Sequence, residues 1–337
     1  MTGEGPQAHS GQLFISWARF QRRNESMQPY FGYNLHYLPP LFEAGWAKPF
    51  SYLVQTLRTL RLIRRLRPQV LWVQMPPTFL AHLIVWTRPL VAQAEMRLVA
   101  DCHNRTFRPP WSRLPGLVSM LNRFDSVVVH NEEIARTATE MGLDTKRLSV
   151  LETRPAQIDQ AEVLCKEGAE TSTDTVLVPC SFNADEPIDA LLGAAARAPG
   201  LRFLVSGNLA KARARGVVDA APENVVFTGF MSKADYERTL CEAAVILGLT
   251  EIEGIQLSVA NEAVGAGKAM VLSDTAILRT LFGSAALFTK NEPEAIATAC
   301  RRAVSDRAIL DARSRELSSQ REERWNRQAG QLAARLR

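Results

Sequence analysis

The sequence predicts an α/β protein made of two doubly wound, Rossmann-like parallel sheets that face a cleft, followed by a helical tail. Short apolar runs alternate with longer amphipathic segments along the chain, and this β-α alternation is typical of parallel sheets with helical crossovers. Most of the runs are continuously apolar, as in strands that are covered on both faces. The pattern also starts again once, so the 337 residues fit two domains.

In the first half of the chain, the expected strands are short runs rich in Val, Leu and Ile. They are Gln12–Ser16, Val70–Gln74, Arg97–Ala100, Ser126–Val129 and Leu148–Leu151. Two amphipathic segments between them, Tyr52–Leu66 and Ile134–Met141, are expected helices. Gly142 follows the second one and supplies the left-handed residue with which many helices end.

The second half repeats the alternation after a polar stretch that is poor in strand-forming residues. Its expected strands are Thr175–Pro179, Arg202–Ser206, Asn224–Phe227, Ala244–Leu249, Ala269–Ser273 and Ala286–Phe288. Pro187–Ala198 is an expected helix, because the polar residues Asn183, Asp185 and Glu186 precede it and can cap it.

These elements divide the chain into five segments. We expect a disordered N-terminus over residues 1–11, a first Rossmann-like domain over residues 12–152 and a linker over residues 153–173. A second Rossmann-like domain covers residues 174–305, and a charged helical tail covers residues 306–337 and packs back on the first domain.

Composition excludes several classes of protein. A chain with 46% hydrophobic and 22% charged residues is neither disordered nor collagen-like. The net charge of +5 permits anionic partners, but no nucleic-acid-binding motif is present, so no nucleic acid partner is expected.

The cysteines and the termini indicate a cellular compartment. The five cysteines are odd in number and scattered, without a C-x-x-C pair, which argues against a disulfide framework or a zinc site and for a reducing compartment. The N-terminal residues lack the regions of a signal peptide. The apolar stretch Phe79–Val91 is too short and too polar to span a bilayer. We therefore expect a cytoplasmic protein.

The residues that follow strands carry the functional expectations, because ligands of open α/β sheets bind beyond the carboxyl ends of strands. In residues 245–274, an expected strand ends at Thr250 and a helix follows. We expect the backbone N–H groups of Gly254–Gln256 to lie at the helix N-terminus and to bind a diphosphate. Ser258 and Glu262 are four residues apart and share a helix face. A surface helix with solvated carboxylates is the alternative.

Several segments together resemble one known family. NEAVGAGKAMVLSD resembles the EAMACGKPVVASD-type block of glycosyltransferase family 4, whose enzymes have the GT-B fold. NVVFTGFMSKADYERTLCEAAVILGLT and PCSFNADEPIDALLGAA resemble earlier parts of that family's second domain. VLWVQMPPTF, DCHNRTF and VVVHNEEIARTATEMGL resemble the strand ends of its first domain. The resemblance covers nearly the whole chain and implies an acceptor domain followed by a nucleotide-sugar-binding domain.

The resemblance implies that Glu262 bonds the ribose hydroxyls of the donor. The family has a second Glu where this chain has Gly254, and the adjacent Glu253 is the catalytic candidate there. The other donor-binding candidates of this domain are Gly254, Ile255, Gln256, Ser258, Gly229, Phe230 and Asn208.

The family also holds the donor diphosphate with an Arg and a Lys that follow the first strand of its second domain. Residues 181–186 of this chain read SFNADE and contain no cation. We expect Lys211, Arg213 or Arg215 to substitute, with Lys211 as a catalytic candidate and Arg213 as a donor-binding one. A solvated basic helix is the alternative.

In the first domain, His103 follows a strand, and the resemblance places a His here beside the reacting sugar, where its imidazole donates a hydrogen bond. The adjacent Asn104 is an acceptor candidate. After the first strand, Arg19, Arg22 and Arg23 are candidates for phosphates of the donor or of a lipid-pyrophosphate acceptor, because guanidinium groups match phosphate oxygens. An ordinary basic turn is the alternative.

These residues predict a hexosyltransferase-type glycosyltransferase that moves a sugar from a UDP- or GDP-linked donor to a lipid-linked or polysaccharide acceptor in glycan or exopolysaccharide assembly. The resemblance implies retention of the anomeric configuration, no bound metal, and no cofactor besides the donor substrate. Two other functions remain open: a nucleotide-sugar epimerase of the GT-B fold, and a non-catalytic sugar-nucleotide-binding or scaffold subunit.

A basic segment in the first domain indicates a further partner. Arg58–Arg67 contains several arginines, and Trp46 and Phe50 lie nearby, a composition that is compatible with a helix on an anionic membrane surface. We therefore expect peripheral association with the inner face of the membrane. A core-facing helix with a solvated basic face is the alternative.

Overall fold

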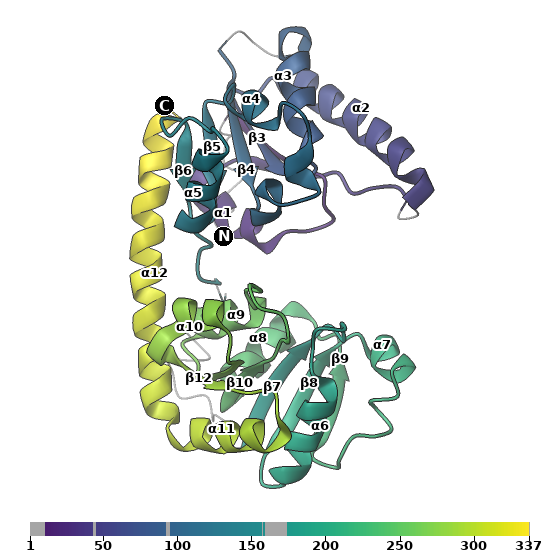
Figure 1. Cartoon of the computed structure of the whole chain (residues 1–337), viewed down its shortest axis with the longest axis vertical. Coiled ribbons are helices and arrows are strands. Elements are labelled where there is room, and N and C mark those ends of the chain that lie inside the picture. Colours follow the sequence, from purple (N-terminus) through teal and green to yellow (C-terminus); the bar gives the residue numbers. More distant parts are fainter. Residues whose placement is uncertain (1–10, 43–44, 92–94, 157, 159–173, 337) are drawn as a thin grey trace, which may run out of the picture. The chain divides into compact units, whose positions relative to one another are not determined.

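The computed structural model describes residues 11–42, 45–91, 95–156, 158 and 174–336, and the chain divides into two compact units (Figure 1). Unit 1 comprises residues 1–154 and 323–337, and unit 2 comprises residues 155–322. The N-terminus expected to be disordered, apart from Gly11, and most of the expected linker lie outside the described residues.

Unit 1 contains a six-stranded sheet in which all pairs of neighbouring strands are parallel. The strands are β1 (Gln12–Ser16), β2 (Asn34–Tyr37), β3 (Val70–Met75), β4 (Arg97–Cys102), β5 (Ser126–Val129) and β6 (Leu148–Val150). They lie in the order β2-β1-β3-β4-β5-β6, so the chain winds outward from β1 in one direction and from β3 in the other. Five of these strands coincide with expected ones within two residues at either end.

The strand that the sequence analysis missed is β2, whose sequence is NLHY. It lies at one edge of the sheet and pairs with β1 alone. Its four residues are all half-buried, so it does not carry the apolar run that identifies a strand covered on both faces.

Helices cover both faces of the unit 1 sheet. They are α1 (Arg22–Phe31), α2 (Lys48–Leu66), α3 (Phe79–Val91), α4 (Leu117–Leu121) and α5 (Glu132–Glu140). Side chains alternate between the faces with period two. Leu13, Ile15 and Val73 belong to the core on one face, and Phe14 and Trp72 belong to the core on the other.

Unit 2 repeats this architecture with a second six-stranded parallel sheet. Its strands are β7 (Thr175–Cys180), β8 (Arg202–Gly207), β9 (Val225–Gly229), β10 (Val245–Gly248), β11 (Met270–Ser273) and β12 (Ala286–Thr289). They lie in the order β12-β11-β10-β7-β8-β9. The helices are α6 (Ile188–Arg197), α7 (Leu209–Ala214), α8 (Lys233–Glu242), α9 (Ser258–Ala266), α10 (Ala276–Phe282) and α11 (Pro293–Ser305).

The tail forms one long helix, α12 (Arg307–Arg335), drawn in yellow in Figure 1. Its first part belongs to unit 2, where Leu310 joins the apolar core. Its last part belongs to unit 1, where Trp325 and Leu332 are buried against the face that carries Phe14. The Arg154 guanidinium lies 4.7 Å from the centre of the Trp325 ring, which ties the end of the first domain to this helix.

The cysteines differ in part from expectation. Cys102, Cys180 and Cys300 are free and buried, whereas Cys241 is disulfide-bonded. The expectation of a chain without disulfides is therefore wrong at Cys241.

Candidate functional site

Each sheet has one topological switch point, the place where the winding direction reverses and where open α/β sheets bind ligands. In unit 1 it lies between β1 and β3, and in unit 2 it lies between β7 and β10. The sequence-predicted residues group around the carboxyl ends of these and the neighbouring strands. We describe the two groups separately, one in each unit.

The unit 1 group is built around Asp101, a fully buried carboxylate in β4. Arg23, from the first turn of α1, lies 3.4 Å from the Asp101 Oδ1 atom and is itself buried. His130, directly after β5, approaches the same oxygen with its Nε2 atom at 3.3 Å. A buried carboxylate needs such partners, because an isolated buried charge is very unfavourable.

Arg23 also connects α1 to the end of the last strand of the sheet. Its Nη1 atom donates to the Glu152 carbonyl oxygen and its Nη2 atom to the Leu151 carbonyl oxygen, each at 2.8 Å. The guanidinium group is therefore engaged inside unit 1. The structure does not support the expectation of a phosphate contact for Arg23.

A neutral hydrogen-bond network continues the cluster across the sheet. Gln74, which is in register with Asp101 on the adjacent strand, accepts a hydrogen bond from the Ser16 hydroxyl at 2.6 Å. It also exchanges two hydrogen bonds with the Asn24 amide, each at 3.2 Å. This network and Arg23 fix the first turn of α1 on the polar end of the sheet.

The charges of the cluster follow from burial and from neighbouring charges. Burial alone would raise the pKa of Asp101, but the Arg23 charge and then His130 hold it well below its ordinary value. Burial, followed by the Arg23 charge, lowers the pKa of His130 to about 4, against the opposing effect of Asp101. At neutral pH the carboxylate is therefore ionised and His130 is neutral.

His103 lies beside this cluster, directly after β4. Its backbone N–H donates to the Met75 carbonyl oxygen at 2.9 Å, which fixes the residue on the end of β3. Its ring packs edge-on against the ring of His130, with 4.9 Å between the ring centres. Burial lowers the pKa of His103, so its imidazole is neutral at pH 7. A neutral imidazole carries one donor and one acceptor nitrogen.

Four polar atoms at the ends of these strands are buried and have no hydrogen-bond partner within the described part of the chain. They are Asp101 Oδ2, His103 Nδ1, Asn104 Oδ1 and Thr106 Oγ1. Buried polar atoms are nearly always paired in folded proteins, so such a concentration indicates a polar ligand. His103 and Asn104 both carry one of these atoms, whereas the side chains of Arg19 and Arg22 lie exposed on the surface of unit 1.

In unit 2, a buried network positions the loop that follows β10. The Thr250 backbone N–H donates to the Ser273 hydroxyl oxygen at 2.9 Å. The Ser273 hydroxyl donates to Asn291 Oδ1 at 2.7 Å, and the Asn291 amide donates to the Thr250 carbonyl oxygen at 2.9 Å. Sequence analysis did not assign Ser273 and Asn291 to the site. Their position directly at the ends of β11 and β12 is the signal that could have found them.

The helix after this loop begins later than expected. α9 starts at Ser258, and Gly254, Ile255 and Gln256 lie in the loop before it. The expectation that their N–H groups form the helix N-terminus is therefore wrong. Leu257 occupies the N-cap position and makes no side-chain capping bond, so the first amide N–H groups of the helix, from Ser258 on, have no partner within the helix.

Two further residues of the loop have defined local roles. Glu253 is exposed, and its Oε2 atom accepts a hydrogen bond from the Ala276 N–H at 3.2 Å, at the N-terminus of α10. Gly254 has a φ of 81°, a left-handed conformation that favours glycine. Nothing lies within 4 Å of the position that a Cβ atom would occupy there.

Glu262 is more enclosed than the sequence suggested. Only 6% of the residue is exposed, and its Oε2 atom accepts a hydrogen bond from the Tyr236 hydroxyl of α8. The alternative of a solvated surface carboxylate is therefore wrong.

Cations from α7 reach the loop that follows β7, which lacks a cation of its own. The Lys211 ammonium group donates to Asn183 Oδ1 at 2.6 Å and to the Ser181 carbonyl oxygen at 3.1 Å. Arg215 donates to the Asn183 carbonyl oxygen at 2.9 Å. Arg213 is exposed and makes no such contact in the described part of the chain. Lys211 and Arg215 thus bring positive charge to the switch point.

The neighbouring backbone explains how α7 comes so close. Gly207 has a φ of 143°, and a Cβ atom there would lie 1.9 Å from the Cys180 carbonyl oxygen, so only glycine fits. Asn208 caps α7, because its Oδ1 atom accepts from the Lys211 N–H at 3.1 Å. Asn208 therefore orients Lys211.

An anion already occupies the turn after β7. The Glu186 carboxylate accepts hydrogen bonds from the N–H groups of Ser181, at 2.9 Å, and Asn183, at 2.8 Å. Phe182 between them has a φ of 53°, which turns both N–H groups towards one acceptor. Elsewhere at this end of the sheet, Gly229 closes β9 and Phe230 after it is 81% exposed, an aromatic face open to a ligand.

Within the described residues, no three His, Cys, Asp or Glu side chains gather in a way that could hold a metal ion. No helix among the described residues combines the length and apolar character needed to cross a bilayer.

Comparison with known proteins identifies the fold. No protein-family model matches the chain, and no curated protein matches it in sequence. Solved structures do match. HepE of Anabaena, in complex with UDP and glucose, is 13% identical, with a TM-score of 0.67 over 96% of this chain and 99% of that chain.

Two further structures agree over the whole chain. Sucrose-phosphate synthase of Thermosynechococcus elongatus is 13% identical, with a TM-score of 0.66 over 96% of this chain and 97% of that one. A UDP-forming trehalose-phosphate synthase of Burkholderia xenovorans is 11% identical, with a TM-score of 0.66 over 97% and 98%. Together with the two parallel sheets, these matches show that this chain has the two-domain GT-B fold.

Proposed function

We propose that this protein is a glycosyltransferase that transfers a sugar from a nucleoside-diphosphate sugar to an acceptor. The observation that carries the proposal is the end-to-end GT-B match, which includes structures of HepE solved with UDP and with UDP-glucose. UDP is therefore our first choice over GDP for the donor. Two features of unit 2 support a diphosphate ligand: the amides of the first turn of α9 and the two cations, Lys211 and Arg215, at the switch point.

We assign the donor to unit 2. Glu262 is the ribose ligand in this proposal, because the resemblance to glycosyltransferase family 4 puts a ribose-binding Glu at this position and a carboxylate is a strong acceptor for hydroxyl donors. Phe230 offers an exposed ring for the base. Lys211 stabilises the departing diphosphate and takes the place of a metal, so transfer is expected to persist in EDTA.

We assign the reacting sugar and the acceptor side to unit 1. Burial keeps His103 neutral, and its unpaired Nδ1 atom is the group available to a sugar hydroxyl. Positioning and charge stabilisation carry most of such a transfer. We propose retention of the anomeric configuration because the sequence resembles glycosyltransferase family 4, for which this outcome is the precedent. The acceptor is a lipid-linked sugar or a polysaccharide.

The decisive experiment is calorimetric titration with UDP, UDP-glucose and GDP, followed by turnover with a lipid-linked acceptor. A transferase binds UDP and forms it from UDP-glucose only when the acceptor is present. Release of UDP with a free sugar and without acceptor would instead identify the epimerase. Binding without turnover under every condition would identify the non-catalytic subunit.

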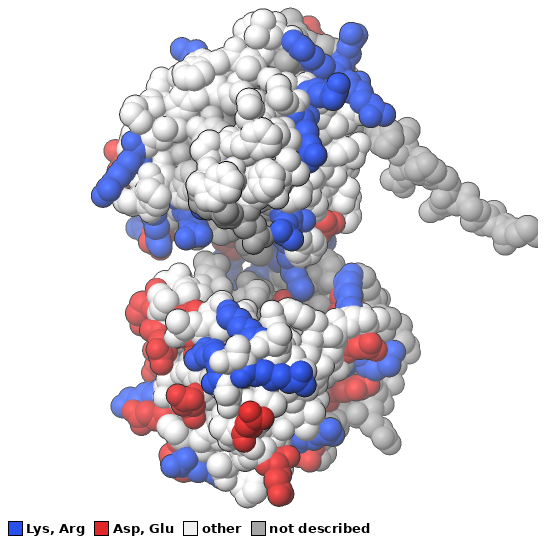
Figure 2. All heavy atoms as spheres, turned by 90° about the vertical axis from the view of Figure 1, so that its right-hand side faces the viewer, with Lys and Arg blue, Asp and Glu red and all other residues white. Residues whose placement is uncertain are grey.

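We also propose that unit 1 associates with an anionic membrane at the cytoplasmic face. Trp46, Phe50, Leu53 and Leu57 are 55–88% exposed and follow one another at helical spacing on and just before α2. α2 contains four arginines and no acidic residue. Figure 2 shows this side of unit 1, the upper body, as a broad uncharged surface with Lys and Arg at its margin. Such an apolar and basic face is typical of helices that lie on anionic lipid.

Vesicle sedimentation tests the association. Wild-type protein should sediment with phosphatidylglycerol-containing vesicles and much less with pure phosphatidylcholine, and high salt should release it. Leu53→Asp with Leu57→Asp should abolish sedimentation. Ile309→Asp, at an equally exposed apolar residue of α12 in unit 2, is the matched control. Equal sedimentation of the two variants would refute the assignment.

A further inference from the structure

A pocket of about 280 Å³ opens at the switch point of the unit 1 sheet. Residues directly after β1 and β3 and the first turns of α2 contribute to it. None of its residues belongs to the cluster around Asp101 and His103. Aromatic and proline side chains form most of its wall: Trp17, Phe42, Tyr52, Pro76, Pro77 and Trp111.

The aromatic wall is held in place by contacts among its own rings and with Thr59 and Phe79, which do not line the pocket. The Trp17 indole N–H donates to the Thr59 hydroxyl oxygen at 2.9 Å, and Trp17 is 8% exposed. Its ring stacks on Tyr52 with 6.1 Å between centres, and Phe79 packs edge-on against both rings. Because these rings are already ordered, a ligand that stacks on them does not have to order them first.

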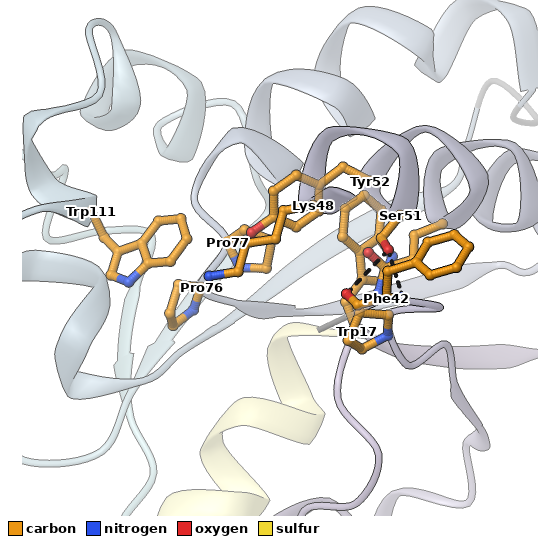
Figure 3. Close-up of a pocket in the computed structure, with 10 residues that line it drawn as sticks. Trp17, Phe42, Lys48, Ser51, Tyr52, Pro76, Pro77 and Trp111 are labelled. Atoms are coloured by element: carbon orange, nitrogen blue, oxygen red, sulfur yellow. Dashed lines mark hydrogen bonds between the residues drawn. The ribbon is translucent and has the colours of Figure 1, made fainter. Parts of the chain in front are cut away.

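Two polar side chains of the pocket, Lys48 and Gln55, can each form a further interaction with a ligand. Lys48 extends towards Trp111 (Figure 3) and forms no ion pair within the described part of the chain. Gln55 is 1% exposed; its amide N–H donates to the Leu38 carbonyl oxygen at 2.6 Å, but its Oε1 atom is buried without a hydrogen-bond partner. Among the described residues that line the pocket, none carries a carboxylate. The pocket therefore offers one cation and one hydrogen-bond acceptor between aromatic faces.

We propose that this pocket binds a single hexose ring that carries a phosphate group. The C–H faces of the ring stack on the aromatic wall, one ring hydroxyl donates to Gln55 Oε1, and the phosphate pairs with Lys48. The volume lies just below the roughly 300–1,000 Å³ of drug-sized sites, so it suits one ring and not an oligosaccharide. Its place at the switch point is where open α/β sheets bind ligands.

The inference rests on the proposed function only in identifying this ring as the acceptor; binding itself can be tested alone. The phosphate belongs either to a soluble sugar phosphate or to the headgroup of a lipid-linked sugar. Both sources present the same ring and charge to Lys48 and Gln55, so the experiment must include a probe of each kind.

Quenching of tryptophan fluorescence and calorimetry measure binding of glucose 1-phosphate, glucose and inorganic phosphate. Glucose 1-phosphate should bind at least tenfold more tightly than either of the other two. Lys48→Gln should weaken it about tenfold, because a charged hydrogen bond is lost, and Trp111→Leu should weaken it and reduce the quenching. Lys146→Gln, at an exposed lysine of the same unit, is the matched control and should change nothing.

The outcomes separate this inference from the proposed function. The pocket assignment is wrong if the wild type binds UDP but not glucose 1-phosphate, or if Lys48→Gln binds glucose 1-phosphate as tightly as the wild type. Neither result contradicts the proposed function. If glucose 1-phosphate binds as predicted and UDP does not bind, the pocket assignment is supported and the proposed function is contradicted. Glucose linked through phosphate to farnesol, in detergent, decides the source: tighter binding than glucose 1-phosphate assigns the lipid headgroup, and weaker binding assigns the soluble compound.

Discussion

Units 1 and 2 each contain a six-stranded parallel sheet with one switch point, but the chemistry at the carboxyl ends of their strands differs. In unit 1, the charged groups at the strand ends are buried: Asp101 is fully enclosed by Arg23 and His130. In unit 2, the charged groups are mostly exposed: Lys211 and Arg215 reach over the surface to the loop after β7. One architecture therefore supports a rigid buried polar centre in one unit and an open cationic surface in the other.

The difference follows from what covers the end of each sheet. In unit 1, α1 lies over the strand ends, and its residues Arg23 and Asn24 are buried against Asp101 and Gln74. In unit 2, the corresponding positions are loops, and of these Glu251, Glu253 and Gly254 are exposed. Buried charges are costly to disrupt, whereas exposed ones are screened by water.

The largest effect is expected from Asp101→Asn. This variant leaves the buried Arg23 guanidinium without its carboxylate, so the free energy of unfolding should fall by about 3–5 kcal/mol. Urea denaturation followed by circular dichroism measures it. The matched variant in unit 2 is Asp274→Asn, at an exposed ion pair with Arg279, where the loss should stay below about 1 kcal/mol. Similar losses in the two variants would remove the contrast between the units.

Acid should destabilise unit 1 through His130. Its folded pKa of about 4 lies below the ordinary value of 6.5, so between these pH values the unfolded chain binds a proton that the folded chain does not. Stability is therefore full above pH 6.5 and falls as the pH drops towards 4, by about 3 kcal/mol for this difference in pKa. The urea midpoint at pH 7 and at pH 5 measures the fall. His130→Gln should flatten this dependence, and an unchanged slope would contradict the assignment.

His103→Ala should lower kcat by about 100-fold, because a neutral imidazole that assists proton or charge movement contributes at least this much. The affinity for UDP should stay unchanged, since the donor is assigned to unit 2. His36→Ala, on the edge strand β2, is the control and should keep wild-type turnover. Wild-type turnover in His103→Ala would make His103 a structural residue of the cluster.

The smallest effect is expected from Glu262→Gln, which keeps an acceptor for the Tyr236 hydroxyl but removes the charge. UDP affinity should fall about tenfold, as expected for the loss of a charge-assisted hydrogen bond. Tyr236→Phe removes the hydroxyl instead and should lower stability more than UDP affinity. Calorimetric titration measures the affinity. If Glu262→Gln binds UDP as tightly as the wild type, Glu262 serves only to hold α8 through Tyr236.

The sequence alone determined that the chain contains two parallel sheets, and where most of their strands lie. Continuous apolar runs such as Val70–Gln74 and Ser126–Val129 predict buried parallel strands, because a strand covered on both faces has no solvent-exposed face for polar side chains. It also placed His103, Glu262 and Lys211 near strand ends, since chain order fixes which residues follow a strand. The edge strand β2 was not predicted from the sequence, because its residues are only half-buried and do not form an apolar run.

Only the tertiary structure decided what these residues contact. Arg23 and Asp101 are 78 positions apart, and Lys211 meets Asn183 across 28 positions; no local pattern encodes such pairs, because they depend on how α1 and α7 pack on their sheets. The same packing enclosed Glu262 behind Tyr236 and gathered Trp17, Lys48, Gln55 and Trp111 into one pocket. Sequence periodicity determines which face of a helix or strand is buried, but tertiary packing determines which residues contact that face.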